Sequence, residues 1–170
     1  MSSERELIYN QNDIPRKKWR YGFRASAHTG CGWVAAYNAL RIMGYYIAPE
    51  KLIRSYQRHL PIFNGPFGTF ILEPALFFRK MGFPVKLSSK RRQFDRLARE
   101  SDACIMFYYW RKKFRLGAHF VSLHYKDGRY IGYNTFKNSK GPDNYGISLE
   151  SFLKKQGYFF PVLIGIKNKK

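Results

Sequence analysis

Cys31 stands between two glycines, Gly30 and Gly32, at the point where a helical pattern of apolar residues begins. A thiol at a helix N-terminus meets the positive end of the helix dipole and unpaired backbone N–H groups, so we expect its pKa to fall. The glycines would let backbone and substrate approach closely. A thiolate in this position can attack a carbonyl carbon, provided that a base takes the thiol proton and a further group orients that base.

A histidine and an asparagine that could fill these two roles flank a predicted hairpin. The pair Asp127-Gly128 separates two alternating β-prone segments, which is among the strongest hairpin signals in a sequence. His119 and Asn134 are nearly equidistant from this turn, so we expect them to lie close together at the open end of the hairpin. Cysteine, histidine and then asparagine is the chain order of a papain-like triad.

Helical patterns dominate the part of the chain that must position Cys31. Apolar residues recur with a period close to 3.6 from Trp33 to Leu40, and Gly44 ends this first helix. Glycine and proline then divide the chain into a helix at 49–59, a loop at 61–69, a helix at 72–81, a short strand at 84–87 and a basic helix at 89–99.

The second part of the chain has the period of strands. Residues 103–110 form a continuous β-prone run, and after a basic loop the strands 119–125 and 130–134 follow. Ser148 is a predicted N-cap of a short helix that ends at 155, and 161–166 is a last strand. Helices first and an antiparallel sheet second predict an α+β fold, with the nucleophile helix packed on a C-terminal sheet.

The length of 170 residues predicts one domain with a core of its own. Residues 1–22 have no clear periodicity and end in a basic run, so they are interpreted as an N-terminal basic arm laid on a domain at 23–170. The chain has two cysteines, Cys31 and Cys104, which is too few for a disulfide framework, and neither has the spacing of a metal ligand. We therefore expect a reduced compartment and neither a metal nor a cofactor. Cys104 lies in an apolar strand and is expected in the core.

The charge of the chain is strongly positive. Lys and Arg number 31 against 11 Asp and Glu, for a net charge of +20. Such a chain attracts polyanions, and nucleic acid, an anionic membrane surface and cell-wall polymers fit equally well. None of the basic runs matches a known nucleic-acid module. No apolar run follows Met1, and the longest apolar run is too short to span a membrane, so we expect a cytoplasmic protein without a transmembrane segment.

Several of these motifs together resemble a known family. The segment from Gly30 into the helix that ends Tyr37-Asn38-Ala39-Leu40 resembles the nucleophile helix of papain-fold peptidases, in particular the double-glycine leader peptidases that cut bacteriocin precursors. The segments 118–123 and 132–135 and the turn between them resemble that family's histidine strand and hairpin. The resemblance covers roughly residues 25–166. It implies a papain-like fold with Cys31 as nucleophile, His119 as base and Asn134 as orienter.

The sequence departs from this family at one position. The family has a glutamine six residues before the nucleophile that donates to the oxyanion, and here that residue is Ala25. Loss of one such donor lowers the rate on the order of 10²- to 10³-fold. Substitute donors are the backbone N–H of Cys31, an N-terminal residue that folds back, or a nearby side chain; the candidates are Gln11, Asn12, Ser26, His28 and Thr29. Trp33, beside the nucleophile, is a candidate for lining the substrate cleft.

Two functions follow as hypotheses. The first is a papain-type thiol hydrolase that cleaves a peptide or other amide bond through Cys31, His119 and Asn134, with a peptide or protein substrate that the basic surface predicts to be acidic. The second is a papain-like module that does not cut and binds nucleic acid or another polyanion through its basic surface. The residue Ala25 in place of glutamine is the main support for the second hypothesis. His59 and His124 have no predicted role.

Overall fold

A six-stranded antiparallel sheet forms the centre of the molecule. The computed structural model describes residues 7–21, 24–58 and 69–169. The strand order is β3-β8-β4-β5-β6-β7, so the last strand in the chain is an inner strand, paired with both β3 and β4. The strands are β3 Val85–Ser88, β4 Ala103–Lys112, β5 Arg115–Lys126, β6 Arg129–Tyr133, β7 Asp143–Gly146 and β8 Phe159–Ile166.

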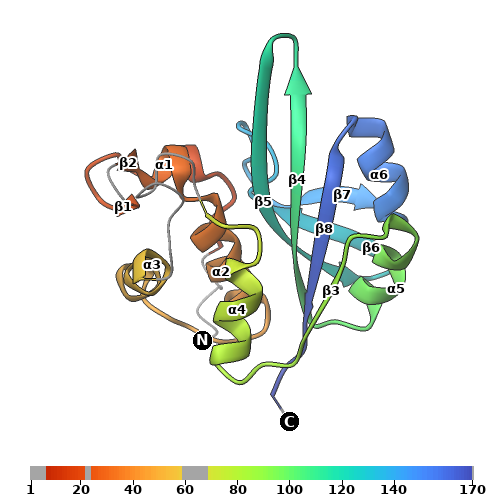
Figure 1. Ribbon diagram of the computed structural model, residues 1–170, viewed down its shortest axis with the longest axis horizontal. Coiled ribbons are helices and arrows are strands. Elements are labelled where there is room, and N and C mark those ends of the chain that lie inside the picture. The colour runs from red at the N-terminus through yellow and green to blue at the C-terminus, as the bar shows by residue number, and fades with distance from the viewer. Residues whose placement is uncertain (1–6, 22–23, 59–68, 170) are drawn as a thin grey trace.

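Helices cover both faces of this sheet (Figure 1). One face carries α2 Cys31–Ile42 with α1 Ser26–Thr29, α3 Pro49–Arg58 and α4 Glu73–Lys80. The opposite face carries α5 Phe94–Arg99 and α6 Leu149–Gln156. Short elements complete the chain: η1 Gln11–Asp13, β1 Arg20–Tyr21, β2 Arg24–Ala25 and η3 Arg91–Gln93. The predicted α+β architecture of helices and an antiparallel sheet is therefore present, and α2, which begins at Cys31, contacts β5 and β4.

The alternation of β4 divides the core into two apolar clusters. Ile105 and Phe107 belong to the cluster that includes α2 and α4, whereas Cys104 and Met106 belong to the cluster under α5 and α6. Successive side chains on a strand point to opposite faces, so a fully apolar strand serves both layers. The expectation that Cys104 lies in the core is confirmed, because it is fully buried.

Strand β5 belongs to two hairpins. Its hairpin with β6 has the predicted register, in which Lys126 pairs with Arg129 and Ser122 with Tyr133. The turn uses positive φ angles at Asp127 (49°) and at the glycine after it (79°), which explains the Asp-Gly signature.

The other hairpin corrects the predicted basic loop before His119. Residues 111–118 are not a loop, because β4 and β5 remain paired as far as Lys112 opposite Arg115. The sheet partner β8 leaves β4 after the pair Tyr109 and Phe159, so the end of the hairpin projects beyond its neighbours (Figure 1). Clustered cations and the absence of a glycine at the turn concealed this hairpin in the sequence.

The remaining predictions of secondary structure are confirmed only in part. The N-cap at Ser148 is confirmed by its acceptance of a hydrogen bond from the backbone N–H of Ser151, at 3.4 Å. Strand β7 was missed, since Asp143–Gly146 is short and polar. The predicted helix at 89–99 is divided into η3 and α5. The predicted loop at 61–69 and the residue His59 lie outside the described residues except for Thr69, which is buried.

Candidate active site

The thiol of Cys31 lies at the first residue of α2. Within the described part of the chain no side chain caps this helix, so the backbone N–H groups of its first turn are left for other acceptors. The flanking glycines are required by packing inside the protein: a Cβ on Gly30 would lie 2.5 Å from the Trp33 indole nitrogen, and one on Gly32 would collide with Thr69. Cys31 itself is half-buried.

Burial raises the pKa of the Cys31 thiol above its ordinary value. Backbone hydrogen bonds from Phe120, Gly32 and Cys31 favour the thiolate but offset only part of this effect. The expectation of a lowered pKa is therefore wrong, because desolvation of the charged form outweighs the helix terminus. The resting group at neutral pH is a thiol, and it needs a base to become a nucleophile.

His119 lies on β5 and directly precedes Phe120, whose backbone forms a hydrogen bond with the Cys31 thiol. Its Nε2 lies 2.6 Å from the main-chain oxygen of Asn134. A carbonyl oxygen only accepts, so Nε2 must carry the proton of this hydrogen bond. Burial lowers the pKa of His119, which keeps the imidazole neutral at pH 7. In that neutral tautomer Nδ1 holds the free lone pair and is the atom able to take a proton.

Asn134 meets His119 through its backbone, whereas the papain-like arrangement predicts its side-chain amide. The residue leaves the end of β6 with a φ of 59°, in the left-handed region that asparagine tolerates better than most residues. This turn of the backbone accompanies the contact between its carbonyl and the imidazole. The predicted proximity of the two residues at the open end of the hairpin is thus observed, with a different atom of Asn134 in contact.

The side chain of Asn134 is held by Gln11 of η1. Its Oδ1 accepts from the backbone N–H of Gln11 at 2.8 Å, and its Nδ2 donates to the Gln11 Oε1 at 3.0 Å. Gln11 in turn donates through Nε2 to the main-chain oxygen of Ala27 in α1, at 3.1 Å. Both amide residues are buried. Gln11 therefore folds back onto the site, and its amide joins the histidine hairpin to the helix segment that precedes Cys31.

The candidate oxyanion donors have different surroundings. The Oγ of Ser26 is buried and accepts from the Trp33 indole at 3.2 Å. The hydroxyl of Thr29 is buried and has no hydrogen-bond partner among the described residues. His28 is exposed. Trp33 is fully buried, and its ring meets Trp19 edge-on at 5.6 Å, so its side chain belongs to the core and not to an accessible cleft.

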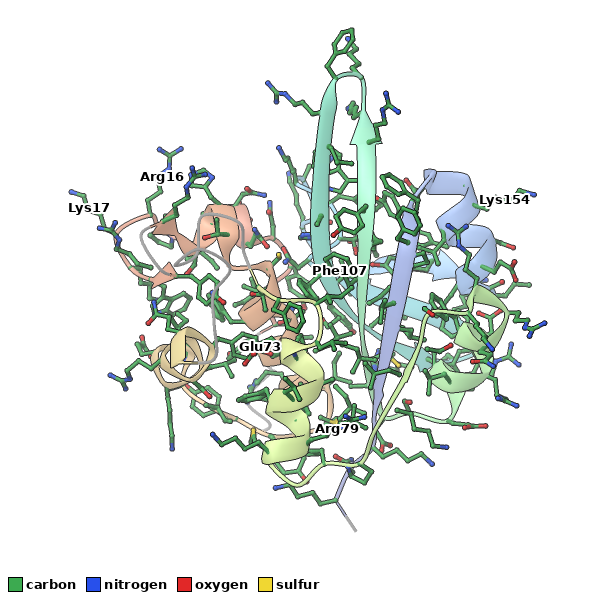
Figure 2. The ribbon with its side chains drawn as sticks, viewed as in Figure 1. Arg16, Lys17, Glu73, Arg79, Phe107 and Lys154 are labelled. Carbon is green, nitrogen blue, oxygen red and sulfur yellow. The ribbon has the colours of Figure 1, made fainter. Side chains whose placement is uncertain are left out.

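Two buried residues with polar side chains near Cys31, Tyr21 and Glu73, were not predicted from the sequence. Tyr21 accepts a hydrogen bond from Thr69 at 3.3 Å, and the carboxylate residue Glu73 is also buried nearby on α4 (Figure 2). Burial raises the pKa of Tyr21, with added repulsion from Glu73 and Cys31. No local pattern marks these residues, because Tyr21 lies in a segment without clear periodicity and a single glutamate at the start of a helix is ordinary surface composition.

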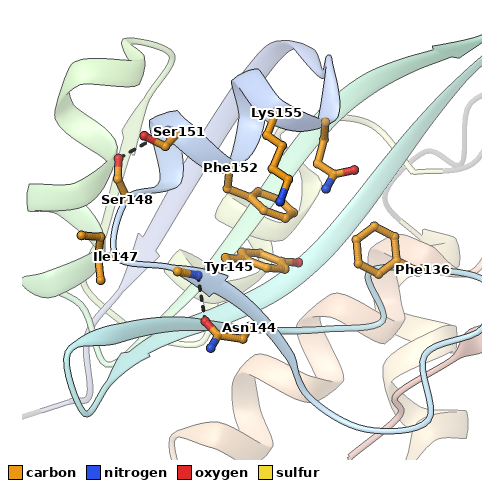
Figure 3. Close-up of a pocket in the computed structure, with 10 residues that line it drawn as sticks. Phe136, Asn144, Tyr145, Ile147, Ser148, Ser151, Phe152 and Lys155 are labelled. Atoms are coloured by element: carbon orange, nitrogen blue, oxygen red, sulfur yellow. Dashed lines mark hydrogen bonds between the residues drawn. The ribbon is translucent and has the colours of Figure 1, made fainter.

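A separate open hollow of about 470 Å³ lies between β7 and the start of α6 (Figure 3). The ring of Tyr145 stacks on Phe152 at 3.8 Å along one side, and Phe136 and Lys155 contribute to the rim. None of the predicted site residues lines this hollow. Among the described residues, no group of three His, Cys, Asp or Glu gathers as a metal site, and no helix is long and apolar enough to cross a membrane.

Comparison with known proteins identifies a relative in fold only. No protein-family model and no curated protein sequence matches the chain. Among solved structures, the chain is similar to the peptidase domain of ComA from Streptococcus, a bi-functional ABC transporter involved in a quorum sensing pathway. The TM-score is 0.54 at 15% identity, over 82% of this chain and 91% of that domain. The chain thus has the fold of a papain-like peptidase domain.

Proposed function

We propose that the protein is a cysteine peptidase or amidase in which Cys31 is the nucleophile and His119 the base. The observation that carries this proposal is the hydrogen bond from His119 Nε2 to the Asn134 carbonyl, because it leaves Nδ1 as a proton acceptor. The next residue along β5 bonds the thiol through its backbone. The peptidase-domain fold supports the same assignment at the level of fold.

The reaction begins as the sulfur of Cys31 bonds to the substrate carbonyl carbon while its proton passes to Nδ1 of His119. The resulting imidazolium gives this proton to the leaving amine as the carbon–nitrogen bond breaks, and a thioester remains on Cys31. Water then attacks the thioester, with His119 taking its proton, and the carboxylic acid leaves as the thiol is restored. Asn134 acts as the orienter through its carbonyl, which also stabilises the imidazolium.

The oxyanion is proposed to bind the backbone N–H of Cys31 and the hydroxyl of Thr29. The N–H lies in an uncapped first turn, and the hydroxyl has no partner among the described residues. Ser26 is a less favoured donor because its Oγ lies against the indole of the fully buried Trp33, and His28 is less favoured because it is exposed. Gln11 directs its Nε2 to Ala27, so we assign it to positioning Asn134.

The substrate is proposed to be a peptide or protein, with acidic sequences favoured by the charge of +20. Basic side chains extend from both sides of the molecule, with Arg16 and Lys17 beside α1 and Lys154 on α6 (Figure 2). Such a distribution raises the encounter rate with acidic partners in general and selects no single bond.

A second candidate function is a papain-like module that binds a polyanion without cutting. It is favoured by Ala25 at the position of the expected glutamine and by the raised pKa of Cys31. The two candidates differ in the reactivity of one sulfur, since only an enzyme needs a thiol that responds to a base.

A substrate-like covalent probe tests the proposal. We expect a peptidyl acyloxymethyl ketone with a Gly-Gly sequence to add to the protein once, at Cys31, as followed by intact mass. Cys31→Ala should remain unmodified, and Cys104→Ala, the matched control, should react like the natural protein because Cys104 is buried. Labelling no faster than that of a free thiol, in a protein whose His119→Ala variant labels equally, would favour the binding module.

A further inference from the structure

The hairpin of β4 and β5 extends beyond the rest of the sheet. Strand β8 pairs with β4 only as far as Tyr109, and β6 pairs with β5 only from Ser122 onward. Residues 110–117, here called the ribbon tip, are therefore a two-stranded ribbon without a third strand among the described residues. Figure 1 shows this ribbon standing clear of the helices on both sides.

The ribbon tip carries apolar side chains at its far end. Phe114 is fully exposed, at 104% of its reference area, and Leu116 is 67% exposed. Single exposed apolar residues are ordinary on a protein surface. Here, however, two of them occupy a projecting turn where no part of the described chain covers them.

Four cations surround these two side chains: Arg111, Lys112, Lys113 and Arg115, all of them exposed. No acidic residue occurs between Asp102 and Asp127, so both strands of the hairpin lack carboxylates. Like charges placed this close repel one another and contribute nothing to the stability of the ribbon. Their arrangement is explained by an anionic partner outside the protein.

The ribbon is ordered before it meets any partner. Trp110 lies across Gly117 on the opposite strand, and a Cβ on that glycine would collide with the indole. An isolated two-stranded hairpin is marginal in water, and this cross-strand contact stabilises it. The pairing then continues to the turn at Lys113, which has a φ of 51°. The tip therefore presents its apolar residues on a paired ribbon that a cross-strand contact stabilises.

We propose that the ribbon tip docks on an anionic lipid bilayer, with Phe114 and Leu116 inserted among the acyl chains and the four cations at the level of the headgroups. Apolar burial and attraction to anionic lipid act together in interfacial binding of this kind. A nucleic acid would also attract the cations, but it rewards stacking on aromatic faces, and Leu116 offers none.

Docking in this way would place the candidate active site near the membrane. His119 lies five residues from Phe114 along the same strand, a distance of roughly 17 Å at the rise of a β-strand. The proposal leaves the chemistry at Cys31 unchanged and adds a location, at which substrates attached to or leaving a membrane would meet the site. It stands whether or not the thiol is catalytic.

The test is sedimentation of the full chain with vesicles of phosphatidylcholine alone or mixed with phosphatidylglycerol. We expect binding to the mixed vesicles, weakened at least about tenfold by Phe114→Ala with Leu116→Ala, which removes apolar burial. Lys112→Glu with Lys113→Glu should weaken it by about thirtyfold or more, since each cation near an anionic surface contributes roughly fivefold. Thermal melts of each variant check that the fold is retained.

The matched control is Arg16→Glu with Lys17→Glu, which changes the net charge equally but lies beside α1 (Figure 2). We expect it to weaken vesicle binding less than about threefold. Two results would overturn the proposal. One is equal weakening by both charge variants with no effect of the apolar variant, which would mean general attraction by the charge. The other is an apolar variant that no longer binds single-stranded RNA but still binds the mixed vesicles. That result would indicate that the ribbon tip binds nucleic acid.

Discussion

The two hairpins that share β5 differ in almost every respect. The hairpin with β6 has a turn signature, a third strand beside it in β7, and ends at a partly buried hydrogen bond between His119 and Asn134. The hairpin with β4 has no such signature, stands free of other strands at its end, and exposes Phe114. One strand thus connects a buried site, where desolvation sets the pKa values, to an exposed tip, where charge and apolar area remain free for a partner.

This difference predicts that substitutions at the His119 end of β5 leave vesicle binding intact, and that substitutions at the ribbon tip leave the reaction rate intact. The largest expected effect is on the reaction rate, at the His119 end. We expect His119→Ala to lower kcat/KM on a small soluble amide or peptide by about 10³-fold or more, because the variant lacks the proposed base, Nδ1. Phe114→Ala with Leu116→Ala should keep the rate of the natural protein in the same assay. A His119→Ala variant that retained its rate within about tenfold would remove this residue from the chemistry.

A smaller loss is expected from Gln11→Ala. The change leaves the Asn134 Nδ2 and the Ala27 oxygen without their partners, which costs on the order of 1–3 kcal/mol of stability for buried groups. The Asn134 Oδ1 keeps the backbone N–H of residue 11 as its donor. Asn134 is then held by one hydrogen bond from residue 11 in place of two, and a shift of about 1 Å in a positioning group lowers the rate on the order of 10²-fold. We expect kcat to fall with KM nearly unchanged.

Asn12→Ala is the control for this variant, because Asn12 belongs to the same short helix and is exposed. Urea unfolding measures the stability of both proteins, and the pH profile of kcat distinguishes positioning from a general loss of structure. A Gln11→Ala protein with normal kcat and reduced stability would assign Gln11 to the fold alone.

The pH dependence is a third test of the buried end. Burial lowers the pKa of His119 below its ordinary 6.5, so the base stays active at pH 7 and the acid limb of the rate should have its midpoint below 6.5. The stability linked to this histidine is present above 6.5 and is lost as the pH falls through the folded pKa.

Burial also raises the pKa of Cys31 above 9.0, so the stability linked to the thiol is present below 9.0 and lost as the pH rises through the folded pKa. In His119→Ala, iodoacetamide labelling of Cys31 should increase only above pH 9, because burial raises the pKa of the thiol. Fast labelling that persists into acid solution would indicate a thiolate–imidazolium pair and contradict the neutral resting state.

The smallest effects concern the two turns. Gly128→Ala places a side chain at a φ of 79° and should destabilise the protein by about 1 kcal/mol in urea unfolding. Lys113→Gly relieves a lysine from a φ of 51°, and we expect it to leave the stability unchanged or raise it by up to about 1 kcal/mol. A destabilised Lys113→Gly would show that the turn of the ribbon tip depends on its lysine.

Local signals in the sequence predict the local part of this structure. The Asp127-Gly128 turn fixes the register of β5 with β6, and the spacing from Trp33 onward predicts α2 to within two residues. Both depend on neighbours in the chain, so composition and period suffice.

Features that depend on distant parts of the chain were not predicted in detail. Gln11 was one of two residues, with Asn12, that could fold back, and its contact with Asn134 spans 123 residues. The contact of His119 with the Asn134 carbonyl, in place of its side-chain amide, depends on a backbone φ angle that the residue pattern does not predict. The raised pKa of Cys31 depends on burial by other elements. The ribbon tip was mistaken for a loop because its cations outweighed the alternation of its strands.

The inner position of β8 bears on how the protein is made. This strand is synthesised after the other five, yet among the described strands β3 pairs only with it and β4 needs it on one side. A nascent chain therefore holds two unpaired strand edges until β8 has been made, and such edges favour aggregation and chaperone binding. The sheet that supports His119 should form only after that point. A chain from which β8 is deleted should accumulate as an insoluble or degraded product.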